Sequence, residues 1–289
     1  MAVYERSYRP YEGPLTGAWS RLWVLPRYAY ENILRSRGFV AFAVFSGLAP
    51  AAAAVLIYLH HNLYALKALH LDAGLLAERV PINGLFFMIL IAFQGFLAFI
   101  LALVMGPSLM VPDFANNGLA LYLCRPFSKW EYILGRFTAL AVLMSAITWV
   151  PGLILFVFQS FLGGWSWFAG NAFIAWGIVA GSMIWIVLVC LVTMAASAWV
   201  RRKPLAAALV LGFFFVSRAM AGAITEIYRT WVGDLFNPWG LTRTVWAGLF
   251  NVNSPTHVPV ALAWTDLVLL IGLCLWLLSR KVKAYQVVR

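Results

Sequence analysis

Apolar runs long enough to cross a membrane recur along this chain, and they limit its fold more than any other feature does. A helix needs about 20 mostly apolar residues to cross roughly 30 Å of hydrocarbon. Runs of this kind cover residues 39–59, 85–109, 134–161, 176–199, 205–224 and 260–278. They are continuous rather than alternating in polarity, so we expect helices and no barrel strands. The sequence predicts an all-α, polytopic membrane protein with six transmembrane helices.

The composition and the remaining segments fit this division of the chain. Hydrophobic residues make up 63% of the sequence and charged residues only 11%, which is too apolar for a water-facing surface. Residues 1–38 are predicted to form a cytoplasmic N-terminal segment with an amphipathic helix in the membrane interface, which we expect Pro26 to break or bend. This helix either only faces lipid or also contacts a cytoplasmic partner. Residues 39–289 form the transmembrane domain.

Lys and Arg residues are distributed unequally between the two sides of the predicted spans. Four fall on one side and sixteen on the other, and the sixteen are Arg6, Arg9, Arg21, Arg27, Arg35, Arg37, Arg125, Lys129, Arg136, Arg201, Arg202, Lys203, Arg280, Lys281, Lys283 and Arg289. Basic residues stay on the cytoplasmic side of short loops, so both termini are expected in the cytoplasm of a protein of the cell's inner (plasma) membrane. The net charge of +11 then reflects this bias and attraction to anionic membrane lipid, and it predicts no nucleic-acid partner.

Cysteine and histidine residues predict neither a disulfide nor a metal site. Cys124 falls in an inner loop, while Cys190 and Cys274 fall inside spans. His60, His61 and His70 are grouped in an outer loop, but no CxxC pair, HxxxH pair or acidic cluster accompanies them. No cofactor is expected to bind this chain.

The inner connection between the second and third spans, residues 106–136, carries the most informative pattern. Pro107 and Pro112 are expected to interrupt the second helix, and residues 118–124 to form a short apolar helix. Ser128 and Glu131 then match a Ser-x-x-Glu capping box, in which each side chain satisfies a backbone N–H of the next helix. A short helix held rigidly between two spans at the inner face is suited to receive force.

This connection resembles that of the ABC-2 type permeases of ATP-binding-cassette transporters, of the nitrous-oxide-reductase-maturation and gliding-motility type. The family carries a pattern like Arg-Pro-x-Ser-Arg-x-Glu-Tyr-x-x-Gly-Lys, and the matching residues are Arg125, Pro126, Ser128, Lys129, Glu131, Tyr132, Gly135 and Arg136. The chain departs from the family at Asn116 and Asn117, where an acidic residue usually precedes the Gly, and at the apolar residues 119–121. Six spans, an interfacial N-terminal helix and broken helices before the last span also match the type V exporter fold, so the resemblance covers most of the chain.

The resemblance implies a transporter subunit and its partners. It implies a second permease subunit, as a homodimer, and cytoplasmic ATPase subunits that bind ATP and Mg and drive export. It assigns contact with the ATPase to residues Arg125, Pro126, Ser128, Lys129, Glu131 and Gly135. The sequence contains no Gly-x-x-x-x-Gly-Lys-Ser/Thr, so the chain is not expected to be an enzyme and hydrolysis must come from another subunit. The apolar spans favour a hydrophobic or lipid-like substrate.

Two other function classes stay open from the residues alone. An intramembrane enzyme needs polar groups at depth, but the spans contain only two obvious ionisable residues. A channel or secondary transporter usually has a broken helix in the membrane, and the one strong central break is Pro151-Gly152, which otherwise serves as a packing kink.

Two charges and three tryptophans in the C-terminal half give further expectations. Arg218 of the fifth run and Asp266 of the sixth lie at similar depths, so we expect them to pair, unless each turns toward the outer interface. The long connection 225–259 contains Trp231, Trp239 and Trp246, which favour the headgroup level, so this connection is expected at the membrane surface.

Overall fold

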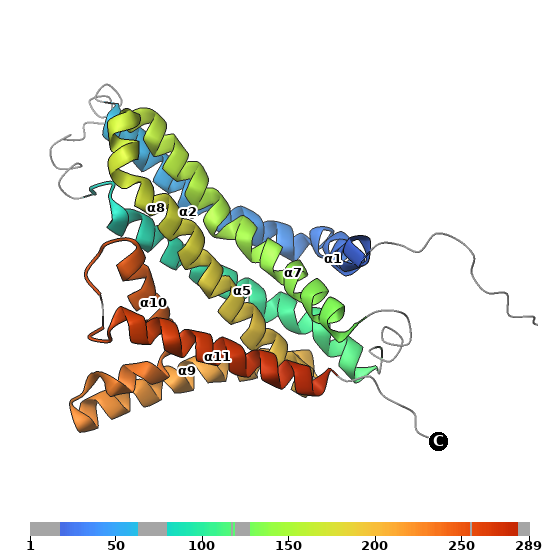
Figure 1. The fold of residues 1–289 in the computed structure, drawn as a ribbon. Helices are drawn as coiled ribbons and strands as arrows, with labels where there is room; N and C mark the ends of the chain where they lie inside the picture. The colour runs from blue at the N-terminus through green and yellow to red at the C-terminus, as the bar shows by residue number, and fades with distance from the viewer. Residues whose placement is uncertain (1–17, 63–79, 117, 119–127, 255, 283–289) are drawn as a thin grey trace, which may run out of the picture.

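The part of the chain that the structure describes is helical and contains no strand, as the sequence predicts. This computed structural model describes residues 18–62, 80–116, 118, 128–254 and 256–282. The elements in chain order are α1 (Ala18–Leu34), α2 (Arg37–His61), α5 (Gly84–Ala115), α7 (Lys129–Ile147), α8 (Trp149–Trp199), α9 (Lys203–Tyr228), the short 3-10 helix η1 (Trp231–Phe236), α10 (Pro238–Leu249) and α11 (Val260–Lys281) (Figure 1).

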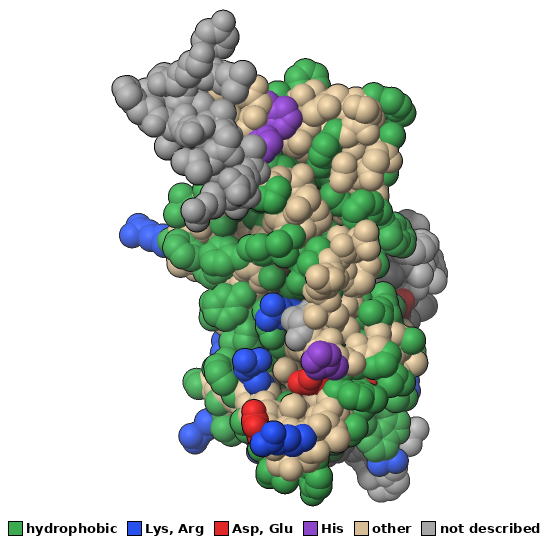
Figure 2. Space-filling view, turned by 90° about the vertical axis from the view of Figure 1, so that its left-hand side faces the viewer, with side chains coloured by type: hydrophobic (Ala, Val, Ile, Leu, Met, Phe, Trp, Pro, Cys, Tyr) green, Lys and Arg blue, Asp and Glu red, His purple; other side chains and the backbone are tan. Residues whose placement is uncertain are grey.

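Five helical segments are long and apolar enough to cross a membrane. They are α2, α5, α9, α11 and the 71-residue segment Lys129–Trp199 that α7 and α8 form together. Large apolar side chains such as Phe161 and Leu269 point outward, with 84% and 70% of their surface exposed. Hydrophobic side chains also cover much of the face in Figure 2, where charged ones gather in the lower half of the view. The architecture is that of a multi-pass membrane protein.

The 71-residue segment folds back on itself as a helical hairpin. Gly164 adopts φ +77° and ψ 176°, a conformation that a glycine reaches without a Cβ clash. Residues on either side of it then meet in antiparallel register. The Phe156 and Trp167 rings lie 5.6 Å apart, and the Cys190 and Met144 sulfur atoms lie 3.6 Å apart. We had expected residues 162–175 between two separate spans, but the helix resumes directly after Gly164.

A second break separates α7 from α8. Thr148 has φ −94° and ψ −90°, which is not helical. Pro151 has no N–H to donate to the Ile147 carbonyl, so the helix is weakest at this point. A Cβ on Gly152 would lie only 3.0 Å from a side-chain carbon of Ile178, so the two arms of the hairpin pack closely here. The Pro151-Gly152 pair therefore lies at a closely packed break between α7 and α8.

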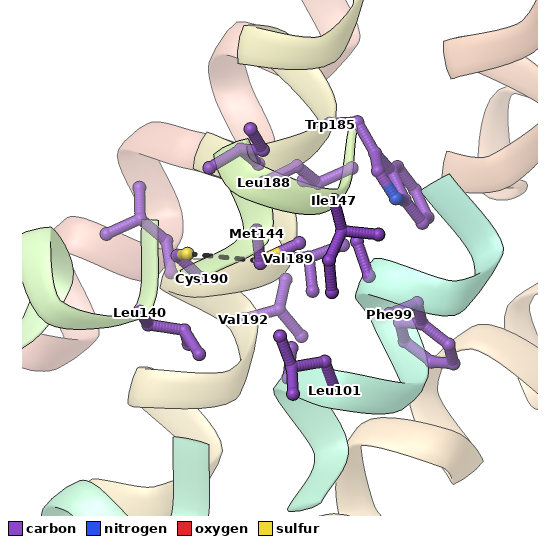
Figure 3. Close-up of a cluster of buried hydrophobic side chains, with 14 of the residues drawn as sticks. Phe99, Leu101, Leu140, Met144, Ile147, Trp185, Leu188, Val189, Cys190 and Val192 are labelled. Carbon is purple, nitrogen blue, oxygen red and sulfur yellow. Dashed lines mark hydrogen bonds between the residues drawn. The ribbon is translucent and has the colours of Figure 1, made fainter. Parts of the chain in front are cut away.

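The core lies where α5 packs against both arms of the hairpin. Figure 3 shows side chains of three helices converging there: Phe99 and Leu101 of α5, Leu140, Met144 and Ile147 of α7, and Trp185, Leu188, Val189, Cys190 and Val192 of α8. Each of these side chains is less than a tenth exposed. The hairpin and α5 therefore form the rigid centre of the molecule, while α2, α9 and α11 keep much larger apolar faces exposed.

Pro107 and Pro112 do not interrupt their helix as the sequence predicts, and Pro26, expected to break or bend the N-terminal helix, does not break it. Helix α1 runs through Pro26, and α5 runs through both Pro107 and Pro112 to Ala115. Each proline removes one backbone hydrogen bond, but the α5 residues Pro107, Leu109, Met110 and Val111 around this point are buried. In α5, tertiary packing thus outweighs the lost hydrogen bonds and keeps the helix continuous.

The connection before α11 contains α10, which packs into the bundle. Trp246 is fully buried, and its indole Nε1–H donates to the Gly181 carbonyl at 2.8 Å. Trp185 donates in the same way to the Gly95 carbonyl at 2.8 Å. A glycine has no side chain to cover its carbonyl, so it offers both the space and the acceptor that a buried tryptophan needs.

Candidate functional site

The described residues of the predicted coupling motif stand at the start of α7. The Ser128 Oγ accepts from the Glu131 backbone N–H at 3.2 Å, and the Glu131 Oε2 accepts from the Ser128 N–H at 2.6 Å. The predicted capping box is therefore confirmed. It fixes the direction in which the chain enters α7, because both partners hold the first turn in place.

An ion pair that we did not predict from the sequence joins α5 to α7 beside this cap. The Arg136 guanidinium of α7 donates to the Asp113 carboxylate near the end of α5 at 2.5 Å. The Tyr132 hydroxyl donates to the same carboxylate oxygen at 2.7 Å. The Arg136 guanidinium also lies 5.7 Å from the centre of the Tyr132 ring. Asp113, Tyr132 and Arg136 form what we call the anchor triad.

Burial makes the anchor triad a firm attachment. The side chains of Asp113 and Arg136 are only 13% and 11% exposed, and Tyr132 is fully buried. Water screens such a pair little, and a charge left alone there would be costly. The segment between residues 116 and 128 is therefore fastened at both ends, by Asp113 on the α5 side and by the capping box on the α7 side.

The sequence did contain a signal for the anchor triad. Asp113 is the only charged residue in the 32 residues of α5, and a lone charge at the end of an apolar helix needs a partner. Arg136 is matched to the family motif, but no spacing rule connects positions 113 and 136. Their contact depends on how α5 and α7 pack.

Helix α1 packs beside this region, as Figure 1 shows. Ala29 and Ile33 are buried, and the Tyr30 hydroxyl donates to the Thr138 carbonyl of α7 at 3.2 Å. Burial raises the pKa of Tyr30 to about 12, so the hydroxyl keeps the proton that it donates. Because α1 rests on α7, a displacement of α7 would act on α1 as well.

The other predicted coupling residues are found in different surroundings. Lys129 is exposed, and its Nζ lies 5.6 Å from the centre of the Trp130 ring. Gly135 is buried inside the bundle. Arg125, Pro126 and the predicted short helix at 118–124, apart from residue 118, lie outside the described residues. The exposed residues that the structure places at the end of the connection are Ser128, Lys129 and Trp130.

Arg218 and Asp266 do not form an ion pair within this single chain, among the residues that the structure describes. Arg218 is exposed on α9, and Asp266 is partly buried on α11. Helix α9 packs mainly against η1, α8 and α5, whereas α11 packs against α8 and α10. The expected pairing requires α9 and α11 to be neighbours, but each of them packs against α8 and α10 instead.

The described residues contain no cluster of metal ligands, and no sequence relative indicates a further site. Within residues 18–62, 80–116, 118, 128–254 and 256–282, no group of three or more His, Cys, Asp and Glu side chains is placed to hold a metal ion. His60 and His61 are neighbours on α2 with ring centres 5.6 Å apart, and His70 is outside the described residues. No protein-family model and no curated protein sequence matches the chain.

Proposed function

We propose that this chain is the membrane-spanning subunit of an ATP-driven transporter, in which a separate ATPase acts on the α5–α7 connection. The observation that carries the proposal is the double fastening of this connection. The anchor triad ties α5 to α7, and the capping box orients α7 where the connection ends. Force applied to the connection would therefore move α7 as a unit and α5 with it.

The hairpin supports six membrane crossings in this subunit. The two arms on either side of Gly164 have about 35 residues each, so each is long enough to cross the hydrocarbon layer. Together with α2, α5, α9 and α11, this gives six crossings. An even number leaves both termini on one side, and the excess of Lys and Arg assigns that side to the cytoplasm.

The energy for transport must then come from a partner subunit. The sequence has no P-loop to hold nucleotide phosphates, so ATP and Mg would bind to the ATPase and not to this chain. By the family resemblance, two copies of the chain work with two ATPase subunits and export the substrate. The apolar walls of the bundle favour a hydrophobic or lipid-like substrate.

Photo-crosslinking from the end of the connection tests this proposal. A benzoylphenylalanine at Trp130, which is 46% exposed, would capture the partner in the native host cells. Trp165 is the matched control, because it is 79% exposed but follows Gly164, at the turn of the hairpin and not at the start of α7. We expect the Trp130 position to capture a protein whose peptides include a Gly-x-x-x-x-Gly-Lys-Ser/Thr sequence, and the Trp165 position not to do so. Capture of no such protein from Trp130, or equal capture from both positions, would count against the proposal.

A further inference from the structure

An apolar groove lies between the ends of α8 and α11. It has a volume of about 280 Å³, and its walls are Ala195, Ala196 and Trp199 of α8 and Leu277 of α11. The two alanines leave space that larger side chains would fill. Every wall atom belongs to an apolar residue, so the groove suits a hydrocarbon chain.

Basic side chains surround one end of this groove. Lys281 follows Leu277 by one helical turn on the same face of α11, and its Nζ lies 5.0 Å from the centre of the Trp199 ring. Arg280 lies 4.2 Å from the centre of the Trp276 ring. The exposed residues Arg201, Arg202 and Lys203 follow Trp199 directly.

The two described segments beside the groove contribute only positive charge. The segments 195–203 and 276–282 contain five Lys and Arg residues and no Asp or Glu. Lys281 lies over the Trp199 ring at the end of the groove, and an ammonium group has three hydrogens that can donate to an anion. An apolar groove with positive charge at one end matches an anionic lipid, which has a hydrocarbon tail and a phosphate head.

We propose that this groove is a binding site for an anionic phospholipid. One acyl chain lies along Ala195, Ala196 and Leu277, and Lys281 binds the phosphate at the end of the groove. Arg201 and Arg202 attract the same headgroup from the start of the next connection. A zwitterionic lipid also carries a positively charged ammonium group, which these cations repel, so the site selects for net negative charge. The site stands apart from the coupling role of the α5–α7 connection.

Lipid retention by the purified chain tests this site. The probes are dioleoyl phosphatidylglycerol and dioleoyl phosphatidylcholine, added in equal amounts to the full chain in detergent and counted by native mass spectrometry. We expect phosphatidylglycerol to be retained preferentially. Lys281→Gln should weaken this retention about fivefold, the contribution of one basic residue near an anionic surface. Ala196→Leu should reduce it as strongly without changing any charge, because the added side chain fills the groove.

Two matched variants control for charge and size. Lys129→Gln removes another lysine that lies over a tryptophan ring, and Ala223→Leu enlarges an exposed alanine near the far end of α9. Both should retain phosphatidylglycerol as the unchanged chain does, and size-exclusion chromatography should show that all four variants are folded. Equal retention of the two lipids would overturn the proposal, as would equal behaviour of variants and controls. If Ala196→Leu instead separated a dimer without reducing lipid retention, a second copy of the chain would be the occupant.

Discussion

At the scale of single residues, Asp113 has the greatest influence on the candidate site. It places the only charge of α5 where Arg136 and Tyr132 of α7 can both donate to it. Because the pair is buried, removing one partner affects stability much more than the pair itself does. The complete pair costs little free energy of folding, whereas a single charge left buried costs much. The same carboxylate therefore stabilises the fold and fixes the geometry of the connection.

Removing one partner of the anchor triad should harm the protein more than removing both. We expect Arg136→Ala to lower the free energy of unfolding by about 3 kcal/mol, because it leaves the Asp113 carboxylate buried without its cation. The Asp113→Asn, Arg136→Ala double variant should recover a substantial part of that loss. Unfolding in detergent, followed by circular dichroism, measures both. Additive losses would show that the two side chains act independently.

At the scale of elements, close contact between α5 and α8 sets the register of the core. An ideal Cβ built on Gly106 would lie 2.3 Å from the Thr193 Cγ2, which is much closer than atoms can approach. The side chain of Leu140 lies 3.5 Å from the same point, so α7 also limits the space. Glycine at this position allows three helices to converge.

A single methyl group at position 106 should therefore destabilise the bundle. We expect Gly106→Ala to cost about 1–3 kcal/mol, the usual range for overpacking. Thr193→Ser removes the methyl group that blocks the new Cβ, so the double variant should regain most of the stability. Gly212→Ala is the control, because nothing lies within 4 Å of a Cβ there and a glycine inside a helix is unfavourable. Thermal unfolding of the three variants in one detergent compares them. Equal losses at positions 106 and 212 would contradict this account of the register.

At the scale of the whole molecule, the lengths of the helices determine which segments lie at the same end of the molecule. Helix α9 has 26 residues, so it is about 39 Å long and separates Lys203 from the segment that holds η1 and α10. Asn253 follows α10 and is exposed, as is Lys203. If α9 crosses the membrane, these two positions face different compartments.

Cysteine labelling in intact cells tests this arrangement. Lys203→Cys should be protected from a membrane-impermeant maleimide, and Asn253→Cys should be labelled, because the basic end of α9 is expected in the cytoplasm. Cys124→Ser should be present in both variants, while Cys190 and Cys274 are buried and need no change. Labelling after the cells are opened shows that position 203 is reactive. Labelling at position 203 with protection at position 253 would show that the topology is the opposite of the one expected.

Much of the architecture can be predicted from the sequence, because the bilayer restricts what an apolar chain can do. Each long apolar run became a helix, and Ser128 and Glu131 form the capping box that their spacing predicts. These predictions succeed because they depend on residues within one or two turns of each other. Local hydrogen bonding and side-chain polarity are enough to decide them.

Contacts between distant segments were decided only by the tertiary structure. Pro107 and Pro112 have the local chemistry of helix breakers, yet packing around α5 keeps the helix continuous. Tryptophan favours the membrane interface, but the Gly181 carbonyl accepts a hydrogen bond from the Trp246 indole inside the bundle. Asp113 pairs with Arg136 because α5 packs against α7, whereas Arg218 and Asp266 do not pair, because α9 and α11 each pack against α8 and α10 instead. The sequence alone determined where helices form, through local polarity and hydrogen bonding, whereas the tertiary structure decided which helices touch, because close packing depends on the shapes of all neighbouring side chains at once.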